Sequence, residues 1–311
     1  MADLTFGVTF HPYPVGMPDP DVVIEFAQAA EELGFDSLWV GDHILWRTPL
    51  LEPLTLLAAV ATRTKRIRLG TGVLLLPLRQ PTVVAKMVAT LDYLSRGRVI
   101  LGVGVGGENP KEFEACGVPP GERGRRTDEG IEILRRLWTE SSASFAGQFW
   151  RFSEVDLQPK PVQQPCPPVW IGGRSEAALR RAGRLGDGWI DYFVTPQGFR
   201  ESMARIAAHG AAAGRAMDSF AAAHVLMTYV APTKDEAKRA TEQYLSHYYD
   251  HAFRFLLARY CALGTPEDCI AKVQRFAEAG ARYIVLVPTC GPESIVAQLE
   301  TLAREVVAAF R

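Results

Sequence analysis

Short runs of β-branched and aromatic residues alternate with amphipathic helical stretches along the whole chain. In the first such stretch, Ile24, Ala27, Ala30 and Leu33 recur at helical spacing, and Gly34 follows as a stop residue. The pattern predicts eight strands, at residues 4–10, 36–41, 66–76, 98–105, 168–171, 188–192, 222–230 and 283–287. It predicts helices at about 20–33, 54–61, 82–94, 125–138, 175–185, 199–213, 235–249, 266–279 and 295–310.

This order of elements favours a closed barrel. Strands joined by helical crossovers run parallel, and eight of them indicate a (β/α)8 TIM barrel rather than an open sheet. The 311 residues suit this fold, which typically takes about 250. No change of composition divides the chain, so we expect one domain over residues 1–311. The segments 140–167 and 245–265 exceed plain connections, and we expect excursions over one end of the barrel, the C-terminal mouth.

The composition is that of a packed globular protein, with 48% hydrophobic and 22% charged residues. The 34 lysines and arginines nearly balance the 35 aspartates and glutamates, which argues against a nucleic-acid partner. The uncharged runs are shorter than a membrane span of about 20 apolar residues. The first residues, MADLTFG, do not resemble a secretory signal. We therefore expect a cytoplasmic protein that does not associate with membranes.

The five cysteines form no C-x-x-C pair; they are Cys116, Cys166, Cys261, Cys269 and Cys290. An odd number without such spacing argues against a disulfide framework and against a structural zinc site. We expect free thiols, mostly in packing positions, and no bound metal.

The second predicted strand ends in Gly41-Asp42-His43. In a parallel barrel the active site lies at the C-terminal ends of the strands. A histidine at that place, beside a carboxylate, is a candidate proton-transfer group near neutral pH. The alternative is that Asp42 caps a helix and His43 is an ordinary surface residue.

Glycines interrupt the third and fourth predicted strands. Gly70 and Gly72 indicate a bulge, a ligand close to the backbone, or a strand that bends to close the barrel. Gly102, Gly104 and Gly107 match G-x-G-x-x-G, but that dinucleotide fingerprint belongs to the first strand–helix turn of an open sheet. What remains is a strand end with few side chains, against which a flat ring or a phosphate can lie.

The fifth predicted strand leads through Gly172-Gly173-Arg174-Ser175 into a helix. Free N–H groups and the positive end of the helix dipole suit a phosphate, and Arg174 adds a charged donor. The alternative is a tight turn in which Ser175 only caps the helix.

Four segments together resemble a known family. They are AAEELGFDSLWVGDHIL (29–45), RIRLGTGVLLLPLRQPTVVAKMVATLDYLSRGRVILGVGVGG (66–107), GERGRRTDEGIEILRRLW (121–138) and PKPVQQPCPPVWIGGRSEAALRRAGRLGDGWI (159–190). In order and spacing they resemble the bacterial luciferase-like flavin and deazaflavin oxidoreductases, most of all the branch of probable coenzyme F420-dependent oxidoreductases. Beyond about residue 195 the resemblance reduces to GTPEDCIAKVQRFAEAGARYIVLV (264–287).

The resemblance implies a TIM barrel, usually dimeric, whose cofactor ring lies over the strand ends with its phosphate at the fifth strand. Asp42 and His43 match an Asp-His pair beside the deazaflavin. Trp46 resembles a nearby tryptophan, displaced by one residue, and is a candidate substrate contact. Gly72 and Val73 match a bulge with a non-proline cis peptide behind the ring.

The remaining matches lie in two loops. Gly106, Gly107 and Glu108 match the loop after the fourth strand and its acid, again with an offset of one residue. Gly172 and Gly173 match the glycines of the phosphate loop.

We therefore expect a homodimeric oxidoreductase that moves a hydride between coenzyme F420 and a small organic substrate. His43 would handle the substrate's proton, Asp42 would set the tautomer and orientation of His43, and Glu108 would act as an acid near the ring. One alternative is an FMN-dependent monooxygenase that uses reduced flavin and oxygen. Another is a flavin-binding protein without catalysis. The substrate stays open, because its pocket is built from the C-terminal segments.

Overall fold

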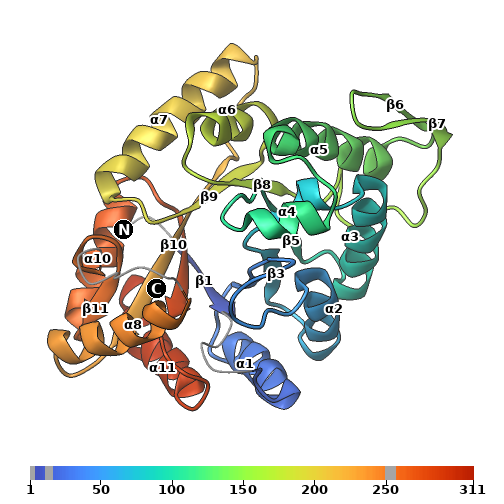
Figure 1. The fold of residues 1–311 in the computed structure, drawn as a ribbon. Helices are drawn as coiled ribbons and strands as arrows, with labels where there is room; N and C mark the ends of the chain where they lie inside the picture. The colour runs from blue at the N-terminus through green and yellow to red at the C-terminus, as the bar shows by residue number, and fades with distance from the viewer. Residues whose placement is uncertain (1–3, 11–16, 249–256) are drawn as a thin grey trace.

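The computed structural model describes residues 4–10, 17–248 and 257–311, and its strands surround a central axis (Figure 1). The barrel strands are β1 Thr5–Phe10, β2 Ser37–Val40, β3 Arg68–Thr71 continued by β4 Leu74–Leu75, β5 Val99–Gly104, β8 Val169–Gly172, β9 Gly188–Tyr192, β10 Ala221–Val230 and β12 Tyr283–Pro288. Neighbouring strands pair in parallel, and the pairings of β9 with β10 and of β12 with β1 close the ring. The predicted (β/α)8 barrel is confirmed.

Helices form the outer layer of the barrel (Figure 1). They are α1 Pro20–Glu32, α2 Pro53–Arg63, α3 Pro81–Ser95, α4 Pro110–Ala115, α5 Arg123–Thr139, α6 Glu176–Leu185, α7 Pro196–Ala212, α8 Lys234–Tyr248, α9 Leu257–Tyr260, α10 Pro266–Glu278 and α11 Ile295–Thr301. Several begin with proline, which suits the first turn because an N–H there has no partner within the helix. Across the described part of the chain, no helix is long and apolar enough to cross a membrane.

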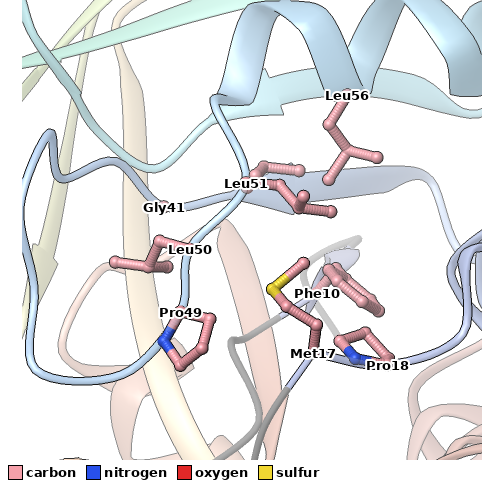
Figure 2. Close-up of a pocket in the computed structure, with 9 residues that line it drawn as sticks. Phe10, Met17, Pro18, Gly41, Pro49, Leu50, Leu51 and Leu56 are labelled. Carbon is pink, nitrogen blue, oxygen red and sulfur yellow. The ribbon is translucent and has the colours of Figure 1, made fainter.

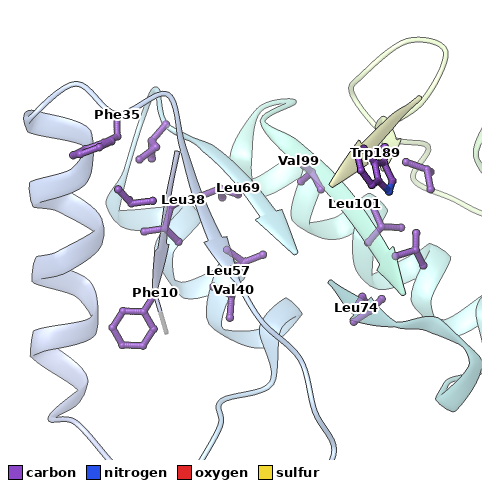
Figure 3. Packing of buried hydrophobic residues seen from close by; sticks show 14 of the residues in the cluster. Phe10, Phe35, Leu38, Val40, Leu57, Leu69, Leu74, Val99, Leu101 and Trp189 are labelled. Atoms are coloured by element: carbon purple, nitrogen blue, oxygen red, sulfur yellow. The ribbon is translucent and has the colours of Figure 1, made fainter. Parts of the chain in front are cut away.

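Alternation along β2 separates the two sides of the barrel wall. Trp39 points inward and packs against Trp170 and Tyr283, with ring centroids 5.2 and 6.3 Å away. Leu38 and Val40 belong to the outer layer between strands and helices, where Figure 3 shows them packed with neighbouring apolar side chains. Period-two alternation in a strand produces this division, and it fills the barrel interior beneath the mouth.

The predicted third strand is divided in the structure. The sequence predicts one strand over 66–76, whereas β3 ends at Thr71 and β4 begins at Leu74. The two residues between them, Gly72 and Val73, form the bulge that the glycines indicate. The short helix α4 is not predicted by the sequence, because six residues give too little periodicity to recognise.

The segment 140–167 lies elsewhere than expected. It forms an antiparallel hairpin of β6 Ala143–Ala146 and β7 Arg151–Val155 beside α5, at the edge of the molecule (Figure 1). Arg126 of α5 stacks over the Phe149 ring at 4.5 Å, and Glu129 accepts the N–H of Gln148 at 2.7 Å. The expectation that this excursion covers the mouth is wrong, because the hairpin packs against the outer face of α5.

The second excursion reaches the mouth in the part that the structure describes. The strand β11 Ala262–Gly264 pairs with the C-terminal end of β10, at Thr228–Val230. The ring of Tyr260 in α9 lies 5.7 Å from that of Phe193, which follows β9. Residues 249–256 of the predicted excursion lie outside the described residues.

All five cysteines are free thiols, as predicted. Burial raises the pKa of Cys261, Cys269 and Cys290 to about 12, so these thiols stay protonated and act as small apolar residues.

Candidate active site

A cavity opens at the C-terminal ends of the barrel strands, above Trp39. Eight of the predicted site residues line it: Asp42, His43, Gly72, Val73, Gly106, Glu108, Gly172 and Gly173. Four others, Trp46, Gly107, Arg174 and Ser175, are close to these in sequence but are not part of the lining. The structure therefore brings the candidates from four different loops to one mouth, as expected for this fold.

His43 is held by a buried carboxylate that the sequence does not reveal. Its Nδ1 lies 3.2 and 3.3 Å from the two carboxylate oxygens of Glu112 in α4. The Glu112 side chain is fully buried and also accepts the N–H of Ile44 at 3.1 Å. A carboxylate beside Nδ1 favours the tautomer with the proton on that nitrogen. The other ring nitrogen, Nε2, faces the mouth and lies 3.7 Å from Glu108 Oε2.

Asp42 has a different partner from the expected one. Its Oδ2 accepts from the N–H of Leu75 at 2.8 Å and from Arg79 Nη1 at 2.7 Å, and its Oδ1 accepts from Arg79 Nη2 at 3.0 Å. The expectation that Asp42 orients His43 is wrong. Both carboxylate oxygens of Asp42 are hydrogen-bonded to Arg79, and the carboxylate that contacts the His43 ring is that of Glu112. This bidentate ion pair connects the loop after β2 to the segment after β4.

Glu108 spans the rim of the cavity. Its Oε1 accepts a 2.6 Å hydrogen bond from the Tyr192 hydroxyl, and its Oε2 faces His43. Burial first, and the Glu108 charge second, raise the pKa of Tyr192, so its hydroxyl remains a donor. Tyr192 ends β9 and is not among the predicted site residues, since a tyrosine closing a strand is common for packing reasons alone.

The peptide bond between Gly72 and Val73 is cis, as the resemblance implies. The Val73 side chain reaches β5 and β8: a Cβ on Gly104 would lie 2.5 Å from Val73 Cγ2, and one on Gly172 would lie 2.8 Å from Cγ1. These two glycines therefore make room for the bulge itself. At Gly41, by contrast, a Cβ would meet only the Gly72 carbonyl at 3.8 Å, so the space is open toward the cavity.

The loop after β5 turns on glycines. Gly106 and Gly107 have φ values of +62° and +122°, which other residues rarely adopt. This turn places Glu108 on the rim and leads through Asn109, whose side chain caps α4 by accepting the N–H of Lys111 at 3.1 Å.

Trp46 stacks on His43, with ring centroids 3.9 Å apart and planes 19° apart. Its place is thus on the face of the imidazole rather than in the cavity lining. It contributes to fixing the ring plane of His43, together with the hydrogen bond to Glu112.

The turn from β8 to α6 has both features that the sequence suggests, a serine helix cap and a glycine loop with a cation of the kind that suits a phosphate. Ser175 caps α6 by accepting the N–H of Ala178 at 3.3 Å, and Gly173 has a φ of +107°. The Arg174 guanidinium is exposed at the same turn, 3.2 Å from the Phe193 carbonyl and 5.6 Å from the Tyr192 ring centre. A cation therefore stands beside a capped helix start.

A second, smaller hollow lies beside the end of β2 (Figure 2). Figure 2 shows the Met17 side chain between Phe10 and the segment Pro49–Leu51. The lining that the structure describes is apolar, so this hollow offers packing surface and no acid, base or cation.

The mouth fits a flat ring system with a polar edge. Gly41, Gly72 and Gly173 present backbone rather than side chains on one side, and His43 with Glu108 supplies polar atoms at the rim. A cleft that joins apolar surface to a few convergent polar groups is the usual form of a cofactor site. Arg174 and the N-terminus of α6 suit a phosphate on the same ligand.

Comparison with known proteins identifies the family. A model of the luciferase-like monooxygenase family matches residues 4–283. The chain belongs to this family. The match to luciferase-like monooxygenases includes β9, β10 and most of the chain beyond residue 195. In that part of the chain, the sequence motifs alone give only a weak resemblance.

Individual luciferase-like relatives carry different names. An F420-dependent glucose-6-phosphate dehydrogenase of Amycolatopsis mediterranei (strain U-32) is 40% identical over 185 residues, which are 55% of this chain and 53% of that relative. The match thus spans about half the length of that protein. The crystal structure of the monooxygenase RslO1 from Streptomyces bottropensis superposes with a TM-score of 0.87 at 25% identity, covering 99% and 100% of the two chains. The coenzyme F420-dependent tetrahydromethanopterin reductase from Methanopyrus kandleri gives a TM-score of 0.84 at 20% identity over both full chains, which shows the shared fold.

Proposed function

We propose that this luciferase-like protein is an oxidoreductase that transfers a hydride between coenzyme F420 and a small organic substrate. The observation that carries the proposal is the His43–Glu112 pair, which presents a histidine Nε2 to a cavity that fits a flat ring. The name of the Amycolatopsis relative, which is 40% identical over 185 residues, supports F420 as the partner.

A deazaflavin bound here would supply a carbon that accepts or gives a hydride. In the oxidation of an alcohol, the substrate's C–H bond breaks with its electron pair and its O–H proton must leave at the same site. His43 Nε2 is placed to take that proton, because Glu112 keeps the other ring nitrogen protonated. In the reverse direction the same atom returns the proton.

The other predicted residues bind and orient in this proposal. Glu108 would act as the acid near the ring, and with the Tyr192 hydroxyl, which the sequence does not single out, it forms the polar rim that positions the substrate oxygen beside His43. Gly72, Val73, Gly106 and Gly107 shape the ring site, while Gly172, Gly173, Arg174 and Ser175 hold the phosphate. Asp42 acts through Arg79 by fixing the loop that carries His43.

Separate titrations of the protein with F420 and with FMN, followed by absorbance and fluorescence, test the cofactor. We expect F420 to bind more tightly than FMN. Loss of F420 absorbance under anaerobic conditions with a panel of alcohols then tests hydride transfer. Tight FMN binding together with oxygen consumption would contradict the proposal.

The FMN-dependent monooxygenase remains the second candidate function. Its support is the monooxygenase RslO1, which matches nearly the whole chain at 25% identity. A flavin monooxygenase must admit oxygen and exclude water around the reduced ring, so oxygen uptake coupled to product formation distinguishes it from an F420 enzyme.

We also propose that the protein is a cytoplasmic homodimer. The family resemblance supports the dimer, and five free thiols are typical of a reducing compartment. Analytical ultracentrifugation of the purified chain tests the oligomeric state, and a single species of monomer mass would contradict it.

A further inference from the structure

The cavity has two unlike halves. The glycine-rich loops after β2, β3, β5 and β8 form one half, and the ends of β9, β10 and β12 form the other. The second half is built from Ile190, Val225, Met227, Val285 and Val287. We propose, resting on the proposed function, that this half binds an uncharged substrate with an apolar body and one hydroxyl or carbonyl group.

The aliphatic wall consists of paired residues on two neighbouring strands. Val225 pairs directly with Val285 across β10 and β12, and Met227 pairs with Val287. Residues two apart on a strand point to the same side, so these four side chains lie on the cavity side of their strands. Val225 is half-buried and Met227 is 6% exposed, whereas Val285 and Val287 are buried beside them. An apolar body placed on this wall gains the hydrophobic contribution of the area that it covers.

A second layer of apolar side chains supports this wall. Met227 and Val287 belong to a buried cluster with Leu245 of α8, Leu257 of α9 and Leu263 of β11. The described part of the second excursion therefore backs the substrate wall with carbon rather than with polar groups. A polar or charged substrate group here would lose its water without gaining a partner.

The charges at the mouth also favour a neutral molecule. Glu108 places a carboxylate on the rim, where it opposes the entry of an anion. Among the described residues on the β11 side, Lys234 pairs with Asp268 at 2.7 Å, Lys272 donates to the Arg259 carbonyl at 2.7 Å, and the Arg259 guanidinium lies over the Tyr260 ring. The exposed cation at the mouth, Arg174, belongs to the cofactor phosphate in the proposed function, so a sugar phosphate would need a second cation or set of N–H donors for its own phosphate.

The polar contacts lie together at one edge of the cavity. His43 Nε2 and the Tyr192 hydroxyl both face Glu108 across the rim. A substrate with a single oxygen can place it there while its carbon body packs against Val225 and Met227. Secondary alcohols and the corresponding ketones have this shape.

Binding of two probes, cyclohexanone and glucose 6-phosphate, tests the inference by ligand-observed NMR on the protein with and without F420. We expect cyclohexanone to bind and glucose 6-phosphate to show no binding at tenfold higher concentration. Stronger binding or turnover of glucose 6-phosphate, or no binding of cyclohexanone in either form, would overturn the inference.

A matched pair of variants tests where cyclohexanone binds. Val225→Thr keeps the side-chain shape but adds a hydroxyl to the wall, so the dissociation constant for cyclohexanone should rise roughly tenfold. Val83→Thr makes the same change on the exposed surface of α3 and should leave the dissociation constant for cyclohexanone unchanged. Equal constants for the Val225 variant and the unaltered protein would place the ketone elsewhere and overturn the inference.

Failure of the proposed function gives a different result. If cyclohexanone binds with the expected response to Val225→Thr but F420 does not bind, the F420 function fails and the apolar site stands. If F420 binds and is reduced by glucose 6-phosphate, the function stands and the substrate class is wrong.

Discussion

The Nδ1 atom of His43 lies 3.2 Å from Oε1 of Glu112, a carboxylate 69 residues later in the chain. The pair joins the loop after β2 to the short helix α4, and it determines which nitrogen of His43 faces the cavity. Glu112 also accepts the N–H groups of Ile44 and Leu45, so one buried carboxylate holds both the ring and its loop. The proton-handling role proposed for His43 depends on this contact.

Replacing Glu112 should distinguish its role in orienting His43 from the effect of its negative charge on catalysis. Glu112→Gln keeps an oxygen that accepts the same N–H bonds, so the fold and F420 binding should persist. It removes the charge that stabilises a developing imidazolium, so we expect kcat to fall about 10- to 100-fold. Steady-state kinetics and thermal unfolding measure the two effects. The matched control is Glu114→Gln on the exposed side of α4, and an equal kcat in both variants would contradict the positioning role.

His43 itself should affect turnover more than binding. His43→Asn retains a hydrogen-bonding side chain but cannot take a proton at Nε2, so turnover should fall roughly 10²–10⁴-fold. F420 binding should change little, because backbone atoms form much of the ring site. Titration with F420 and kinetics per bound cofactor measure these quantities. Normal turnover per bound cofactor, with weaker binding, would make His43 only a binding residue.

The barrel is predictable because its signals are local. Each parallel strand is a short apolar run followed by an amphipathic helix, and that alternation alone gives the strand order. The bulge at Gly72 and Val73 is also predictable, since glycines inside a β-branched strand weaken its regular pairing and favour a break. That residues 1–311 form a single domain stays a prediction.

The contacts of the site are less predictable, because they join residues far apart in the chain. Asp42 and His43 are adjacent, which suggests that one orients the other, yet their side chains have different partners, Arg79 and Glu112. The sequence gives no comparable signal for Glu112. It stands between Lys111 and Glu114 in a helix of six residues, a charged pattern that is usual for an exposed helix surface.

The Asp42–Arg79 pair should contribute strongly to stability. Asp42 is fully buried at its side chain, and Arg79 is nearly so. Arg79→Met leaves this carboxylate without its counter-charge, so the free energy of unfolding should fall by about 3–5 kcal/mol. Arg304→Met removes an exposed arginine of an i,i+4 pair and should change it by less than about 1 kcal/mol. Urea unfolding compares the two, and similar small changes would contradict the structural role of Asp42.

The phosphate turn is best tested at Arg174. Arg174→Glu reverses a charge on an exposed side chain beside the α6 terminus, so F420 binding should weaken by about 1.5–3 kcal/mol without loss of the fold. Gly172→Val is a poorer test, because a Cβ at Gly172 would lie 2.8 Å from Val73 Cγ1 and disturb the bulge. Fluorescence titration of the Arg174 variant measures the effect, with Arg184→Glu near the other end of α6 as control. Unchanged affinity would place the phosphate elsewhere.

The buried pair of Asp191 and His224 predicts a dependence of stability on pH. His224 Nδ1 lies 2.8 Å from Asp191 Oδ1, and both side chains are fully buried. Burial is the main cause that raises the pKa of Asp191 above its usual 3.8, against the opposing effect of His224. The folded protein therefore holds this proton more tightly than the unfolded chain does. The resulting stabilisation is complete below pH 3.8 and is lost as the pH rises through the folded pKa.

Asp191→Asn cannot ionise, so it should escape this loss. We expect the difference in free energy of unfolding to shift in favour of the variant between about pH 4 and pH 7, as measured by urea unfolding at each pH. Asp235→Asn on the exposed surface of α8 is the control and should follow the unaltered protein. A difference between Asp191→Asn and the unaltered protein that stays constant over this range would mean that the carboxyl of Asp191 does not titrate there. Its proton would then have no part in the stability of the packing around β9 and β10.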